Sequence, residues 1–443
     1  MSFARARQRY LQRHIEPGLP GQPGPAIAWD QVLVIPAYRE SAALLQRLSS
    51  LPTGGGRVLV ILVLNRPDSD PDPQANRALR RALATRQGHA QDLLLHLAPQ
   101  LDIYLHDLDT LGGPIAASRG VGLARKIGCD IAFKWICEGA IASRWICSSD
   151  ADARLPQDYF DRLDGAPDDA AAACYPFRHV AGADPACNEA TALYELRLHH
   201  YVLGLEFAGS PYAWHALGSC LAVRPDAYAA VRGFPRRAGG EDFYLLNKVA
   251  KTGPVVRLAG TCIELESRVS SRVPFGTGPA VAGISAAGNP AALPLFYHPA
   301  CYEALRGTLA AAPLLQRAAL AELPHILATA GVDPVLARAC LTVLDDMGTA
   351  RALDHCRRQG GSAGQFLRQF HQWFDAFRTL KFIHGMRDAG WPPRSLADLD
   401  GLQPALWPPG DPRSPAGLCS SVAQRWGWQS QPDVKHEPMQ CAR

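Results

Sequence analysis

The sequence has no apolar run long enough to cross a membrane. The longest, VLVILVL at residues 58–64, is far shorter than the roughly 20 residues of a transmembrane helix. The N-terminus also lacks an apolar signal core after its arginines, which argues against secretion. We therefore expect no transmembrane segment and a cytoplasmic location.

Long runs of charge of one sign are missing as well. The 443 residues include 45 basic and 41 acidic side chains, a net charge of +4, so nothing indicates a nucleic-acid partner. The exception is the arginine-rich stretch at residues 5–13. It is interpreted either as a frayed arm or as a weak peripheral contact with anionic lipid at the inner face of the membrane.

The twelve cysteines contain no CxxC pair, and several lie in apolar runs, as Cys147 and Cys220 do. We expect them to be reduced, buried thiols of a cytoplasmic protein. Internal repeats at solenoid periods are absent. With 47% hydrophobic and 19% charged residues, the chain suits one large domain with appendages or two domains.

What the sequence does contain is an alternation of β-rich runs with helical patterns. This alternation predicts an α/β domain with a mainly parallel sheet flanked by helices. The run at 57–65 is apolar on both faces, as in the middle of such a sheet. Strands are predicted at 31–38, 57–65, 101–109 and 143–150, and helices at 40–51, from about 74, and at 113–128.

Polar residues follow each predicted strand. In open α/β sheets, ligands bind outside the carboxyl ends of the strands. We therefore expect residues 38–40, 65–70, 107–110 and 150–152 to converge on one crevice.

Composition divides the chain into four parts. A Pro/Gly-rich leader, partly disordered, covers 1–29, the α/β domain 30–285, a helical C-terminal region 290–410, and a loosely ordered tail 411–443. In the helical region, residues 366–386 have aromatic side chains at helical spacing. Packing in a core, a dimer contact and a membrane-surface contact all suit that pattern.

Three blocks carry candidate chemistry. In SSDADARLPQDYF, Asp150 and Asp152 follow a predicted strand and have the hard carboxylate oxygens that Mg²⁺ or Mn²⁺ prefers. Acids at strand ends and helix caps are also common for structural reasons alone. The spacing by itself therefore leaves both interpretations open.

The second block, GSCLAVRPDAYAAVRGFPRRAGGEDFYLLNKV at 218–249, brings Glu241 and Asp242 to the start of a helix. Acids there stabilise the helix through a favourable interaction with its dipole. An ionised carboxylate can also serve as a general base. The third block, ESRVSSRVPFGTGPAV at 266–281, contains Arg268 and Arg272. It is either a loop that closes over a diphosphate or an ordinary solvated loop.

In order and content, these blocks resemble the family 2 glycosyltransferases, inverting enzymes of the GT-A fold that use nucleotide-diphosphate sugars. The resemblance covers roughly residues 30–280. IPAYRE at 35–40 resembles the family's opening motif, and GVGLARKIGCD at 120–130 resembles its GxGxARN helix. The aspartate block resembles its metal-binding strand, and the second block resembles its acceptor motif and its GxED catalytic motif.

The resemblance implies a role for each matching residue. Asp150 and Asp152 would hold Mg²⁺ or Mn²⁺ and the donor's diphosphate, with Asp152 as the direct ligand. Asp242 would be the general base, with Glu241 beside it. The arginines of the third block would stabilise the leaving diphosphate, and the acceptor hydroxyl would belong to a glycan, lipid or small molecule. The nucleotide sugar would contact Pro36, Tyr38, Glu40, Asn65, Lys126 and the Asp68–Asp70 loop, and the donor and acceptor pocket would include Trp214, Gly218 and Ser219.

The sequence departs from the family pattern in three places. Arg39 and Lys126 stand where asparagines are usual, and the expected loop at 129–146, which contains KWICEG, is longer than usual. VPFGTG replaces the QxxRW motif of processive synthases, which together with the lack of transmembrane segments disfavours polymer extrusion. Two alternatives remain: a sugar-phosphate nucleotidyltransferase, although IPAYRE is not a GGxGxR-type phosphate loop, and a catalytically silent sugar-nucleotide-binding scaffold.

Overall fold

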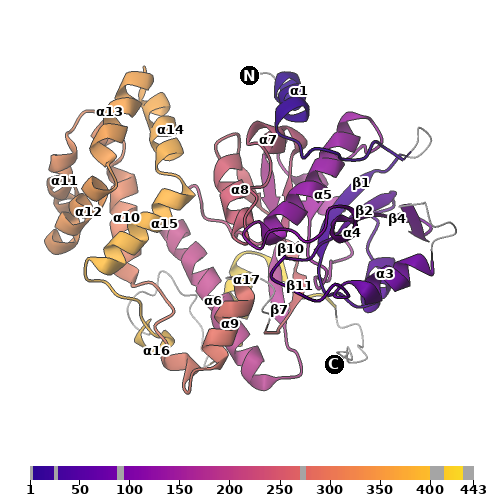
Figure 1. The fold of residues 1–443 in the computed structure, drawn as a ribbon. Helices are drawn as coiled ribbons and strands as arrows, with labels where there is room; N and C mark the ends of the chain where they lie inside the picture. The colour runs from indigo at the N-terminus through magenta and orange to yellow at the C-terminus, as the bar shows by residue number, and fades with distance from the viewer. Residues whose placement is uncertain (1–2, 24–27, 87–93, 270–275, 400–413, 433–443) are drawn as a thin grey trace. The chain divides into compact units, whose positions relative to one another are not determined.

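The computed structural model describes residues 3–23, 28–86, 94–269, 276–399 and 414–432 (Figure 1). It divides into two compact units. The first comprises Met1–Asn188, Ala216–Ala282 and Trp426–Arg443, and the second comprises Glu189–His215 and Gly283–Arg425. The second unit thus takes in the helical region expected after residue 290 and also residues 189–215, which lie inside the expected α/β domain.

The first unit is built on a sheet with eight strands in its described part, in the order β3-β4-β2-β1-β5-β8-β6-β9. Its centre is parallel, since β4, β2, β1 and β5 run in one direction, and helices flank it. The predicted α/β class with a mainly parallel sheet is confirmed. The strands are β1 (Gln31–Ala37), β2 (Val58–Leu64), β3 (Leu94–Ala98), β4 (Leu101–Asp107), β5 (Ile146–Ser148), β6 (Ala172–Cys174), β8 (Leu221–Val223) and β9 (Val255–Arg257).

Hydrophobic burial explains the central strands. Every residue of β2 is fully buried, which accounts for the side chains being apolar on both faces of that strand. The edge strand β3 runs antiparallel to β4, and β8 runs antiparallel to both β5 and β6. Two small parallel pairs complete the strands of this unit: β7 (Phe177–Val180) with β11 (Ile263–Glu266), and β10 (Gly260–Thr261) with β12 (Trp428–Gln429).

Helix α5 (Gly120–Cys137) packs across the central strands (Figure 1). A Cβ atom at Gly128 would lie 2.4 Å from Cγ1 of Val34, so a glycine is what allows the helix to lie this close to β1. The other helices of the unit are α1 (Phe3–Arg13), α2 (Ala43–Ser49), α3 (Arg77–Ala84), α4 (Leu108–Leu111), α7 (Pro225–Ala230) and α8 (Glu241–Val249).

The prediction of a loop at 129–146 is wrong for its first half, because residues 129–137 continue α5. This stretch has no Gly or Pro to end the helix, and its apolar side chains are buried on most sides. Trp135 stacks against Trp29 with 6.0 Å between ring centroids, which gives KWICEG a packing role. The helix ends at Glu138 and Gly139, and Gly139 has φ 84°.

The described parts of both chain ends contain secondary structure. Residues 3–13 of the leader form α1, which packs against α7, and Tyr10 is fully buried. Arg7 pairs with Asp226, so this arginine is part of the folded unit. In the tail, α17 (Pro415–Arg425) and β12 are formed.

The second unit is helical in its described part. Its aromatic core includes Phe366, Phe370, Phe374 and Phe382, so the aromatic pattern at 366–386 packs inside this unit. That segment forms two helices, because Asp375 caps a new one by accepting the N–H of Arg378. The helices are α10 (Pro299–Ala311), α11 (Leu323–Thr329), α12 (Pro334–Asp346), α13 (Thr349–Gln359), α14 (Ala363–Trp373), α15 (Ala376–Asp388), α16 (Leu396–Leu399) and α17, and α6 (Pro185–Phe207) and α9 (Thr277–Ser285) cross the division between units.

No helix in the described ranges has the length and apolar character needed to cross a bilayer. The described cysteines are all free thiols, and all of them except Cys137 are buried.

Candidate active site

The candidate site begins at the carboxyl edge of the sheet. Strand β1 lies between β2 and β5, and the chain leaves β1 at Tyr38 and β5 at Ser149. This is the position at which open α/β sheets bind ligands. Asp150 lies two residues after the end of β5 and has a side chain that is 39% exposed.

A single buried arginine joins three segments here. Arg125, on α5, has a side chain that is only 3% exposed. Its Nη2 donates to Oδ1 of Asp150 at 2.6 Å, and its Nε donates to Oε1 of Glu241 at 3.0 Å. Nη1 donates to the carbonyl of Gly218 at 2.9 Å. The aspartate block and two separate parts of the second block therefore meet on one guanidinium group, whose fixed fork of donors suits several acceptors at once.

Gly218 has to be a glycine for this arrangement. A Cβ atom there would lie 2.6 Å from Nη2 of Arg125, which is closer than any normal contact. The hydroxyls of Ser148 and Ser149 hold the same turn by donating to the carbonyls of Gly218 and Ser219, each at 3.0 Å. The side chain of Arg125 and the end of β5 thus fix the Gly218–Ser219 turn.

The glycines of α5 position the loop that leads to the acidic pair. The N–H of Gly122 donates to the carbonyl of Arg237 at 3.0 Å. A Cβ atom at Gly122 would lie 2.5 Å from that oxygen, so the loop approaches the first turn of α5 closely. Gly240 then adopts the left-handed region, with φ 65°, and α8 begins at Glu241. Gly122 and Gly240 therefore allow the backbone conformation and close approach that bring this acidic pair to Arg125.

Asp242 has an unusual protonation equilibrium. Burial, and next the negative charge of Glu241, raise the pKa of Asp242 from 3.8 to about 7, while Arg125 and the backbones of Phe243 and Gly218 act in the opposite direction. A carboxyl group that titrates near neutral pH can accept a proton from a hydroxyl and release it again. The interaction with Gly218 also places Asp242 at the turn that contacts Arg125.

Asp152 forms an ion pair with a second arginine, Arg268. Its Oδ2 accepts from Nε of Arg268 at 2.9 Å and also from Nη2 of the same side chain. The Asp152 side chain is 23% exposed. Arg125 and Arg268 each engage one oxygen of an aspartate, and the second oxygen of each aspartate is of the hard type that Mg²⁺ or Mn²⁺ binds. The donor set therefore fits such an ion.

Tyr38 and Asp70 meet at the ends of β1 and β2. The Tyr38 hydroxyl donates to Oδ2 of Asp70 at 2.6 Å, and Arg39 donates to both oxygens of Asp70, at 3.0 and 2.8 Å. Arg39 first, and then Tyr38, hold the pKa of Asp70 well below its usual range. Arg39 has φ 55°, a conformation that asparagine adopts more readily than most residues.

The remaining predicted residues of this edge are buried. Nδ2 of Asn65 donates to the carbonyl of Ala37 at 3.2 Å, joining the ends of β1 and β2. Glu40 is 8% exposed and lies 3.7 Å from Arg47, whose Nη2 donates to the carbonyl of Ala151 at 2.9 Å. Pro36 is buried within β1.

One predicted residue of the first unit, Lys126, has its partners elsewhere. Nζ of Lys126 donates to Asp130 at 2.9 Å, to the Tyr10 hydroxyl at 2.9 Å and to the carbonyl of His14 at 3.1 Å, so its ammonium group ties α5 to the N-terminal helix. Trp214 belongs to the second unit and is 4% exposed. Arg272 lies outside the described residues.

Arg125 is the residue that sequence reasoning missed. It lies in the GVGLARKIG stretch, in which Lys126 alone was predicted to contact the nucleotide sugar. The available signal was an arginine within an apolar helix, since a buried arginine requires acidic or carbonyl partners.

Comparison with known proteins gives only distant likenesses. No protein-family model matches the chain, and no curated protein matches it. A mannosyltransferase from Pyrobaculum calidifontis, PcManGT, solved with GDP-Man and Mn²⁺, is similar at 17% identity and a TM-score of 0.35, over 84% of this chain and 93% of that one. S. aureus TarS, solved with UDP-GlcNAc, is similar at 13% identity and a TM-score of 0.33, over 75% of this chain and 92% of that one. Scores this low assign neither a fold family nor a function.

Loss of the Arg125 side chain should destabilise the first unit. Arg125→Met leaves two carboxylates without their buried partner, so we expect the free energy of unfolding to fall by about 3–5 kcal/mol. Adding Glu241→Gln should recover part of that loss, because it removes one of the two charges. Urea-induced unfolding followed by tryptophan fluorescence measures both.

Arg144→Met is the matched control. Arg144 is 65% exposed and pairs with Asp168, which is 90% exposed, so its loss should change the free energy of unfolding by no more than about 0.5 kcal/mol. Similar losses in the Arg125 and Arg144 variants would show that the buried guanidinium does not hold the site together.

Proposed function

We propose that the protein is a glycosyltransferase that moves a sugar from a nucleotide-diphosphate sugar to an acceptor hydroxyl with inversion and without processive synthesis. One observation carries the proposal: Arg125 contacts both Asp150 of the aspartate block and Glu241 of the acidic pair. A sugar transfer needs a diphosphate site beside a general base, and this contact supports such a pairing within one unit.

The donor's nucleotide would lie across the ends of β1 and β2. Tyr38 offers a ring for stacking, and Asp70 and Asn65 offer oxygens to base and ribose. Tyr38 and Asp70 already bond each other, so their geometry is set before a ligand arrives. This arrangement reduces the cost of ordering side chains on binding.

The diphosphate would lie beside Asp150 and Asp152. Mg²⁺ or Mn²⁺ bound by these carboxylates would supply positive charge next to the leaving group. Arg268 pairs with Asp152 in the free protein. As the donor binds, we propose that Arg268 exchanges this carboxylate for a diphosphate oxygen, which its planar donors fit equally well.

Asp242 would take the proton of the acceptor hydroxyl. The acceptor oxygen then forms a bond to the anomeric carbon while the bond from that carbon to the diphosphate oxygen breaks. The electron pair of the broken bond leaves on the nucleoside diphosphate, where Arg268 stabilises the charge. A single displacement from the opposite face inverts the anomeric carbon.

Transfer should be detectable with a panel of UDP-, GDP- and dTDP-sugars and simple sugar or alcohol acceptors. We expect release of a nucleoside diphosphate that requires Mn²⁺ or Mg²⁺ and stops when EDTA removes the metal. Asp242→Asn should lower kcat by about 10²–10⁴-fold, the usual value of a general base, with donor binding retained. Asp152→Ala should weaken donor binding.

Asp168→Asn is the control, because Asp168 is 90% exposed and should leave turnover unchanged. Two outcomes would contradict the proposal. Pyrophosphate release from a sugar phosphate and a nucleoside triphosphate would indicate a nucleotidyltransferase. Tight nucleotide-sugar binding without turnover under any condition would indicate a silent scaffold.

The pH dependence of transfer should follow Asp242. Because its pKa is raised to about 7, the carboxyl takes up a proton at a much higher pH than an ordinary aspartate does, and the protonated form is no base. We expect kcat/KM to be highest above neutral pH and to fall tenfold per pH unit below about 7. A kcat/KM that stays flat from about pH 5 to about pH 8 would exclude Asp242 from this role.

A further inference from the structure

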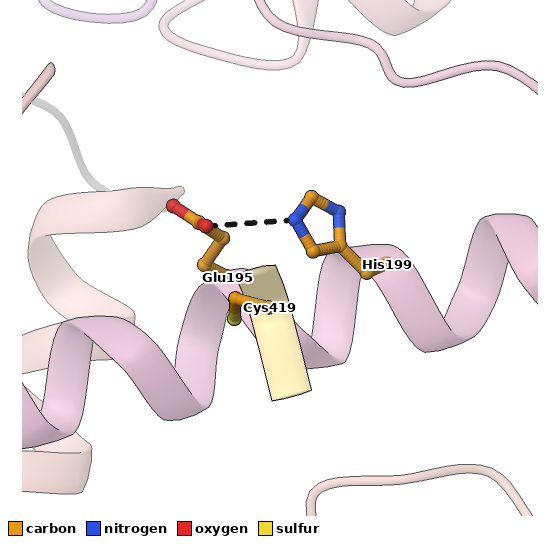
Figure 2. A group of neighbouring side chains, drawn as sticks. All are labelled: Glu195, His199 and Cys419. Carbon is orange, nitrogen blue, oxygen red and sulfur yellow. Dashed lines mark ion pairs between the residues drawn. The ribbon is translucent and has the colours of Figure 1, made fainter. Parts of the chain in front are cut away.

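Helices α6 and α17 of the second unit bring together three potential metal ligands, Glu195, His199 and Cys419 (Figure 2). Glu195 and His199 are four residues apart on α6, so they lie on the same face one turn apart. Cys419 approaches from α17. One ligand atom from each residue lies within 4.8 Å of the others, and this is the one group of its kind in the described part of the chain.

The distance between the histidine and the glutamate suits a tetrahedral ion. Nε2 of His199 and Oε1 of Glu195 are 3.5 Å apart, which is longer than an ordinary hydrogen bond. Zn–N and Zn–O bonds of about 2.1 Å place two tetrahedral ligands about 3.4 Å apart. The thiol of Cys419 lies 3.5 Å from the carbonyl of Ala192, on the turn of α6 that precedes Glu195. The dashed line in Figure 2 marks the Glu195–His199 pair.

His215 contacts the ring nitrogen of His199 that would not bind the metal, and metal-binding histidines usually have such a hydrogen bond. Its Nε2 lies 3.1 Å from Nδ1 of His199. When Nδ1 of His199 carries the proton and donates it to His215, the lone pair of Nε2 faces Glu195 and Cys419. Such a bond fixes the tautomer and the orientation of a ligand ring.

Burial makes an ion favourable at this point. Glu195 is 6% exposed, His199 is fully buried and Cys419 is 6% exposed. A carboxylate is costly to bury, and a divalent cation offsets its charge directly. A set of one thiolate, one imidazole and one carboxylate selects zinc, whereas Mg²⁺ and Mn²⁺ prefer sites of oxygen alone.

We propose that Glu195, His199 and Cys419 bind a zinc ion that joins α6 to α17, with water in the fourth position. This site is separate from Asp150 and Asp152 in residues, in unit and in metal preference, and it does not depend on the proposed sugar transfer. The ion would link two segments that are far apart in the chain and stabilise the folded state as a ligand does.

Cobalt is a direct probe of this ligand set. Full-length protein stripped with a chelator and titrated with Co²⁺ should develop the intense near-ultraviolet band of a cobalt–thiolate bond, together with visible bands of tetrahedral cobalt. Both sets of bands should saturate at one Co²⁺ per chain and disappear when Zn²⁺ is added. A site of carboxylates alone gives no thiolate band, so absence of that band would overturn the proposal.

Two cysteine variants locate the site. Cys419→Ser should lose the thiolate band and the zinc measured in the purified protein. Cys340→Ser, which changes a buried cysteine of the same unit, should keep both, as should Asp152→Ala. Equal zinc content in the Cys419 and Cys340 variants would contradict the assignment. If Cys419→Ser does not fold, His199→Gln replaces it as the test. We expect its cobalt spectrum to be shifted from that of the wild type, and an unchanged spectrum would contradict the assignment.

Discussion

The ion pairs of Arg125 are the interaction on which the rest of the candidate site depends. A guanidinium group that is almost fully buried is stable only where acidic and carbonyl oxygens surround it. Asp150, Glu241 and the carbonyl of Gly218 supply these oxygens. Because the partners come from β5, α8 and the turn before β8, none of these segments can shift without leaving a buried charge uncompensated.

The same arginine separates the roles of two adjacent acids. Glu241 forms an ion pair with Arg125. Asp242 lies next to the negative charge of Glu241 in a largely desolvated position, and its pKa rises to about 7. Neighbouring carboxylates commonly divide acid–base tasks when their surroundings differ in this way. The structural partner of the arginine and the proposed base are therefore consecutive residues on one helix.

Much of the first unit was predictable from short-range patterns. Apolar runs such as Val58–Leu64 identify central strands, and the polar residues after them mark where these strands end. Gly122 and Gly218 could be recognised as parts of motifs. The reason for a glycine at each position could not be predicted, because their close approach to Arg237 and Arg125 is a tertiary contact. The role of Lys126 was beyond sequence reasoning for the same reason: its partner Tyr10 lies in a leader that composition made look disordered.

We propose that the aspartate block binds the metal and diphosphate of a sugar donor beside Asp242. Anomalous diffraction from crystals grown with Mn²⁺ and a nucleoside diphosphate tests it most directly. We expect a manganese peak at Asp152 and Asp150, with the diphosphate between that peak and Arg268. Ordered nucleotide and manganese bound elsewhere, with Asp152 still paired to Arg268, would contradict it.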